Sequence, residues 1–220
     1  LDFIEKGLNP LIDHYTILYF GQPYKFLMPT PFQVILASFH KAFGLVWGLV
    51  FFKLSVFIAT LLMAFFLFKR HGVSFLLQLL AFTLMTSVFV HRSFPRPETL
   101  SYLMCILLVW LIERARVQFS LKNLSALVVF QWAWVNIHYS SIVGYVVLFT
   151  FCAEQMIYMW EQKSFAKLKE IILFGLIALG VGFLNPLFNH PILTTFQFSE
   201  KWTRLISEFQ PQSLVTEFHL

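Results

Sequence analysis

Charge is scarce in this chain. Of its 220 residues only 12% are Asp, Glu, Lys or Arg, whereas 58% are hydrophobic. Soluble domains carry about 25% charged and roughly 45–50% apolar residues, so a soluble protein of this length would lack the charge to cover its surface. Cysteine is also rare, and Cys105 and Cys152 both lie inside apolar runs. That setting is typical of small buried hydrophobic residues, not of a disulfide or a metal site.

Several motifs with known chemistry are missing as well. The sequence holds no CxxC, no HExxH and no glycine-rich phosphate loop. Its start has no basic segment followed by an apolar one, so it does not indicate a signal peptide. Because the first residue is Leu1, we expect the chain to be part of a longer protein. The net charge of +5 is typical of a membrane protein whose cytoplasmic loops are basic and meet lipid headgroups, and it does not indicate nucleic acid as a partner.

Long apolar runs are what the chain has instead. A helix needs about 20 apolar residues to cross a bilayer. We therefore predict an all-α fold, a polytopic bundle of transmembrane helices in one membrane domain, with the helices in 46–184. The fourth run is expected to break at VNIHYSS (135–141), and the last one is short enough to need help from neighbouring helices or from residues upstream of it. The predicted runs are 46–68, 73–90, 99–112, a run from Leu124 that resumes over 142–160, and 171–184.

Two polar segments flank these runs. Residues 1–45 read as an outer loop followed by an amphipathic interfacial helix over 31–44, and residues 185–220 read as an outer segment. Lys53 lies inside the first run, where it either snorkels to the headgroups or lines a polar cavity.

The short basic loops set the expected orientation. Lys and Arg gather in short loops on the cytoplasmic side of membrane proteins, which places 69–72, 113–123 and 161–170 there. The segments HRSFPRPE (91–98) and NIHYSS (136–141) then lie together on the outer face. Irregular backbone at membrane depth is tolerated only against protein or a water-filled cavity. We therefore expect a polar pocket on the outer face.

Arg92 and Arg96 are the first candidate residues in this pocket. They lie four residues apart, beside His91, and Pro95 and Pro97 flank Arg96 and stiffen the turn. Arginine matches phosphate and carboxylate with a planar fork of donors, so the pair is a candidate anion site. An ordinary charged interfacial loop paired with Glu98 is the alternative.

Asn136 and His138 are the next candidates, because polar residues near membrane depth are functional by default. Hydrogen bonding between helices is the alternative for both.

In the first loop, Asp13 is a candidate general base or metal ligand beside His14, and a turn or helix cap is the alternative. Asn185 precedes a proline that ends the last run.

The order of these segments resembles the GT-C glycosyltransferase superfamily. It is most similar to the bacterial branch of protein-mannosyltransferase and lipid A aminoarabinose-transferase relatives. The matching residues span nearly the whole chain, and each motif is short. They are G-x-N-P-x-x-D-H-Y-T…G-Q-P over 7–23, R-x-x-x-R-P-E over 92–98, W-V-N-I-H over 134–138 with Gly144, L-N-P over 184–186 and S-E-F-Q-P over 207–211.

The resemblance implies a function. Such proteins move a sugar from a polyprenyl-phosphate carrier to an acceptor at the outer face, some of them with a divalent metal. It implies Asp13 as the acidic catalytic residue and a phosphate site at Arg92 and Arg96. The cavity would be lined by His14, His91, Asn136, His138 and Asn185. We expect an integral protein of the bacterial inner membrane. The alternative is a non-catalytic membrane subunit, a scaffold with partner subunits in a larger complex.

Overall fold

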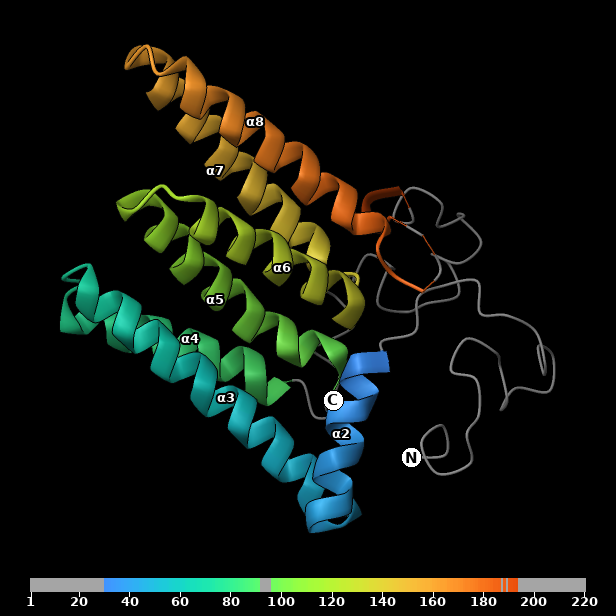
Figure 1. The fold of residues 1–220 in the computed structure, drawn as a ribbon. Helices are drawn as coiled ribbons and strands as arrows, with labels where there is room; N and C mark the ends of the chain where they lie inside the picture. The colour runs from blue at the N-terminus through green and yellow to red at the C-terminus, as the bar shows by residue number, and fades with distance from the viewer. Residues whose placement is uncertain (1–29, 92–95, 187, 189, 194–220) are drawn as a thin grey trace, which may run out of the picture.

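The computed structural model describes residues 30–91, 96–186, 188 and 190–193. Within these ranges the chain forms seven α-helices and one 3₁₀ helix, and no strand (Figure 1). The all-α prediction is confirmed over this part of the chain. The helices are α2 (Thr30–Phe43), α3 (Leu45–Arg70), α4 (Phe75–His91), α5 (Pro97–Val117), α6 (Leu121–Ile137), α7 (Ser141–Glu161), α8 (Phe165–Gly180) and the 3₁₀ helix η1 (Val181–Phe183).

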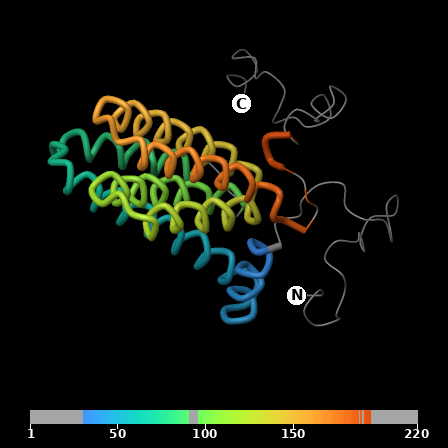
Figure 2. Tube along the Cα trace, turned by 45° about the horizontal axis from the view of Figure 1, so that its top comes forward, coloured from blue at the N-terminus to red at the C-terminus, as the bar shows by residue number. Residues whose placement is uncertain are grey.

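The helices α3 to α8 run back and forth along a common direction, and α2 crosses near one end of them (Figures 1 and 2). We call this end the α2 end. It holds the start of α5, the turn between α6 and α7, and η1. The opposite end, here called the far end, holds the turns at 71–74, 118–120 and 162–164. The described parts of the segments that were predicted to share one membrane face thus lie at one end of the bundle.

Local signals explain where these helices begin and end. Gly44 (φ 78°) separates α2 from α3 and Gly72 (φ 64°) follows α3, both in the left-handed region that glycine tolerates best. Pro97 opens α5, where its missing N–H costs nothing. Ser120 precedes α6, and its hydroxyl accepts a hydrogen bond from the Asn123 backbone N–H at 3.4 Å.

Two apolar clusters hold the helices together. The larger one joins α5, α6, α7 and α8 around fully buried side chains such as Leu108, Leu127, Leu148 and Ile171. The smaller one joins α2 to α3 and α4, where the Phe52 ring meets the Phe32 ring edge-on at 5.6 Å. Packing against α3 thus fixes α2 across the α2 end.

Much of the apolar surface faces outward. The helices α3 and α7 are long and apolar enough to span a membrane, and α4 is apolar but shorter. Only 22% of the most apolar stretch of α3 and 39% of that of α7 is buried, whereas a core helix of a soluble protein would be mostly buried. Large side chains such as Phe66, Leu62 and Ile157 are more than half exposed. A hydrocarbon solvent would suit these faces.

The break predicted over 135–141 is confirmed, because α6 ends at Ile137 and the chain reverses through a tight turn into α7 at Ser141. The last run starts before 171, because the residues from Phe165 already belong to α8, so upstream residues lengthen it as expected. The lysines of this segment leave the helix intact, since lysine is a good helix former and can point into solvent. The predicted helix over 31–44 forms as α2, and its interfacial position stays a prediction.

Candidate functional site

The described candidates gather at the α2 end. Arg96 precedes α5, Asn136 and His138 lie at the end of α6, and Asn185 follows η1. His91 is the last residue of α4 and belongs to the same end, although its side chain is outside the described structure. Asp13, His14 and Arg92 lie outside the described residues, so the structure does not test their assignments.

The start of α5 holds Arg96 in a fixed backbone conformation. Arg96 is extended (φ −123°, ψ 161°), and its N–H donates to the Thr99 hydroxyl at 3.3 Å. The Thr99 N–H donates in return to the Arg96 carbonyl at 2.9 Å. Because these two bonds and Pro97 define the turn, the exposed Arg96 side chain starts from a rigid base.

The turn between α6 and α7 fixes the His138 ring in a similar way. The Ser140 backbone N–H donates to His138 Nδ1 at 3.1 Å, and the Ser141 N–H donates to the His138 carbonyl at 3.1 Å. A ring nitrogen that accepts an N–H carries no proton of its own. The neutral imidazole therefore has its proton on Nε2.

That Nε2 atom faces Glu98. It lies 3.7 Å from Glu98 Oε1, while Nδ1 lies 2.9 Å from the Ser140 hydroxyl. The Ser140 hydroxyl in turn makes a hydrogen bond with the Ser101 hydroxyl. We call Glu98, Ser101, His138 and Ser140 the polar cluster. It connects the first turn of α5 to the α6–α7 turn through side chains alone.

The electrostatics of the polar cluster favour a neutral histidine. Burial lowers the pKa of His138 below its ordinary value of 6.5, and the nearby Glu98 carboxylate opposes this effect. The second oxygen of Glu98, Oε2, is buried and has no hydrogen-bond partner in the described part of the chain. The arrangement can accept or relay a proton, since a carboxylate, an imidazole and two hydroxyls lie next to one another in space.

Asn136 holds a connection between helices. Its Nδ2 donates to the Trp132 carbonyl at 2.9 Å and to the Leu184 carbonyl at 3.2 Å. The Trp132 indole donates to the same Leu184 oxygen at 2.9 Å. These bonds agree with the interhelical alternative for Asn136, and its role in lining a cavity stays a prediction. Asn185 is buried and donates to the Gly182 carbonyl at 2.9 Å, which closes the turn after η1.

A second buried group lies beside η1. The His190 ring packs on the Tyr145 ring with 5.2 Å between centroids. The Ile192 N–H donates to His190 Nδ1 at 3.2 Å, so Nε2 carries the proton and donates to the Leu179 carbonyl at 3.0 Å. A Cβ on Gly182 would lie 2.2 Å from the His190 ring and 2.6 Å from the Tyr145 hydroxyl. His190 thus anchors the chain after η1.

The structure adds residues that the sequence patterns did not single out as a site. Ser101 and Ser140 were missed, and Glu98 entered only as a partner for the arginines. Ser140 lies two residues after His138, a spacing at which a side chain readily meets local backbone and side-chain groups, and this was the only available signal. Among the described residues, no group of three or more His, Cys, Asp or Glu could hold a metal ion.

The chain matches no family model, no curated protein and no solved structure.

Proposed function

We propose that this chain belongs to a polytopic protein of the bacterial inner membrane, similar to GT-C enzymes, that transfers a sugar from a polyprenyl-phosphate carrier at its outer face. The observation that supports it is the placement of Arg96 and of the Glu98–His138 pair at one end of a bundle with exposed apolar faces. A lipid-borne anion needs this combination, because its chain stays in hydrocarbon while its phosphate needs a cationic site at the surface.

The proposed reaction is an in-line displacement at the anomeric carbon. The acceptor hydroxyl forms a bond to that carbon while the bond from carbon to phosphate oxygen breaks, so the configuration inverts. The polyprenyl phosphate leaves with the electron pair, and Arg92 and Arg96 hold its negative charge. Asp13 takes the proton of the acceptor hydroxyl. Some members of the resembled superfamily add a divalent metal; in this chain Asp13 would be its candidate ligand, and the metal would supply positive charge for the leaving phosphate.

Glu98 is a second candidate for the base. Its Oε1 lies 3.7 Å from His138 Nε2, and Glu98 lies two residues from Arg96. In this role Glu98 would take the proton of the acceptor hydroxyl on the side of the anomeric carbon opposite the leaving phosphate, at the same end of the bundle. Asn136, His14, His91 and Asn185 stay candidates for the wall of this cavity.

Sugar transfer in lipid nanodiscs tests the proposal. The full-length protein would be given radiolabelled sugar on polyprenyl phosphate, and transfer would be measured for Asp13→Asn, Arg96→Ala and Glu98→Gln. Arg70→Ala is the matched control, because Arg70 is exposed at the far end of α3. Removing one group that stabilises charge in the transition state lowers rates by about 100- to 1000-fold.

The expected result is a loss of this order for Arg96→Ala and for at least one of the two carboxylate variants, with normal transfer for Arg70→Ala. Full transfer in all three variants would contradict the proposed roles. It would favour the non-catalytic membrane subunit, provided that the variants still assemble with their partners.

A further inference from the structure

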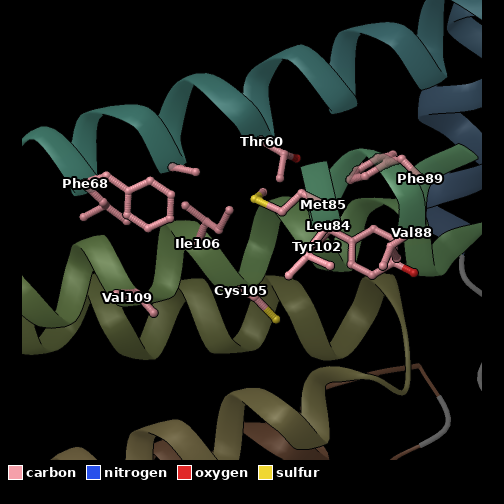
Figure 3. Close-up of a pocket in the computed structure, with 12 residues that line it drawn as sticks. Thr60, Phe68, Leu84, Met85, Val88, Phe89, Tyr102, Cys105, Ile106 and Val109 are labelled. Atoms are coloured by element: carbon pink, nitrogen blue, oxygen red, sulfur yellow. The ribbon is translucent and has the colours of Figure 1, made fainter. Parts of the chain in front are cut away.

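An apolar groove lies between α3, α4 and α5 (Figure 3). Its volume is about 560 Å³, which is within the range of ligand sites of roughly 300–1,000 Å³. Figure 3 shows side chains from the three helices converging on it. The lining includes Thr60 and Leu67 on α3, Leu84 and Val88 on α4, and Tyr102 and Val109 on α5.

The chemistry of the lining selects a hydrocarbon. Nearly all of the side chains that line the groove are aliphatic, aromatic or sulfur-containing. The hydroxyl of Thr60 is already used, because it donates to the Val56 carbonyl at 2.7 Å. A ligand with several polar groups would lose hydrogen bonds to water in this groove that the Tyr102 hydroxyl alone would not replace, whereas an alkyl chain would lose none.

The groove opens towards the outside of the bundle. Its rim includes Leu84, Val88 and Val109, which are 60%, 48% and 43% exposed. The wall on the α3 side belongs to a helix that is long and apolar enough to span a membrane. In a bilayer the open side would therefore meet lipid chains directly, without passage through water.

The direction of the groove points to the kind of lipid. From Tyr102 to Val109 it follows α5 for seven residues, or roughly 10 Å at 1.5 Å per residue. The groove has its Tyr102 end towards the α2 end of the bundle. Arg96 lies six residues before Tyr102, so it lies beyond this end of the groove. A chain in the groove would thus carry its headgroup towards a positive charge at the start of α5.

We propose that this groove binds one acyl chain of an anionic bilayer phospholipid, with the headgroup at the start of α5. The proposal rests on the membrane position within the proposed function and on the charge of Arg96, which that function also uses, and it does not require sugar transfer. A bound chain would fill the space that α3, α4 and α5 leave between them.

Photo-crosslinking of the full-length protein in nanodiscs tests the proposal. The probe is phosphatidylglycerol with a diazirine in the middle of one acyl chain, and adducts are located by mass spectrometry. We expect adducts concentrated on 84–88 and 102–109. Val88→Trp and Val109→Trp should each reduce them several-fold, because the indole fills the groove from an already exposed rim position. Val143→Trp, at an exposed site on α7 outside the groove, is the matched control and should leave them unchanged.

Three outcomes would overturn the proposal. Adducts spread evenly over the exposed faces of α3, α7 and α8, unchanged by Val109→Trp, would indicate ordinary boundary lipid. A second probe, phosphatidylcholine with the same diazirine, carries no net charge. Equal labelling by both probes, together with phosphatidylglycerol labelling that Arg96→Gln leaves unchanged, would remove the role of the anionic headgroup. Displacement of the label by polyprenyl phosphate at equimolar lipid would assign the groove to the carrier instead. Crosslinking does not depend on transfer activity, so its failure is distinct from that of the proposed function.

Discussion

The His138 ring places its Nε2 atom 3.7 Å from Glu98 Oε1, although the two residues are far apart in the sequence. The Ser140 N–H bond to Nδ1 orients the ring for this contact. The pair therefore depends on the α6–α7 turn and on the start of α5 at the same time. A change in either element should be visible in the titration of His138.

The titration of His138 is the first prediction. Burial is the main reason that its pKa is lowered, and Glu98 opposes burial, so Glu98→Gln should lower the pKa further. Labelled imidazole followed by NMR should show a pKa below 6.5 in the parent protein and a lower one in Glu98→Gln. A higher pKa in the variant would contradict the contact.

Stability should follow from the same shift. An unfolded histidine binds its proton near pH 6.5, whereas His138 in the fold binds it only at lower pH. Between these pH values the unfolded chain holds more protons, so the free energy of unfolding falls as the pH drops below about 6.5. The His138→Gln variant should lose this part of the pH dependence in thermal unfolding scans. An identical pH profile for parent and variant would remove the assignment.

Close packing at two glycines leads to a prediction about stability. A Cβ at Gly144 would lie 2.4 Å from Gln131 Oε1 and 2.9 Å from the Trp134 ring, and Gly182 is equally enclosed by His190 and Tyr145. Gly144→Ala and Gly182→Ala should each destabilise the fold by about 1–3 kcal/mol through overpacking. Gly180→Ala is the control, because nothing lies within 4 Å of its Cβ position. It should be neutral or stabilise by about 0.5–1 kcal/mol, as measured by denaturant unfolding.

The shared Leu184 carbonyl leads to a prediction about coupling. Trp132 and Asn136 both donate to this oxygen, so either one alone still satisfies it. Trp132→Phe and Asn136→Ala should each cost about 1 kcal/mol, and the double variant should cost more than their sum. Strict additivity in a double-mutant cycle would show that the two bonds are independent.

Charged residues at the far end should matter much less. Arg116 pairs with Glu113 at 2.6 Å and with Glu154, and Glu113 also lies 3.7 Å from His71. The Arg116 and Glu154 side chains are 41% and 46% exposed, so water and salt weaken their attraction. Arg116→Ala should cost roughly 0.2–1 kcal/mol, and less in high salt. A larger loss that does not change with salt would contradict a surface network.

Sequence patterns predicted the helices well because each one is a long apolar run. The span over 46–68 became α3 with small changes at its ends, since a left-handed glycine marks each boundary. The start of α8 was missed because Lys167 and Lys169 read as a loop, although a surface helix tolerates lysine. The break between α6 and α7 was predicted correctly, because polar residues over 136–141 interrupt the apolar run there.

The contacts within the polar cluster could not be predicted from sequence patterns. The grouping of Arg96 and His138 at one end followed from counting helices between loops. The contact between His138 and Glu98 depends on how α5 packs against the α6–α7 turn, which no local spacing encodes. The pairing of Ser101 with Ser140 has the same origin.

The position of the two ends of α5 on opposite sides of a membrane tests the account most directly. Single cysteines would replace the exposed residues Arg96, Gln118 and Gln162 in a background of Cys105→Ala and Cys152→Ala. A membrane-impermeant maleimide on intact cells should label only Arg96→Cys, and permeabilised cells should show labelling at all three positions. Labelling of Arg96→Cys and Gln118→Cys from the same side would contradict a membrane-spanning bundle with its polar cluster at the outer face.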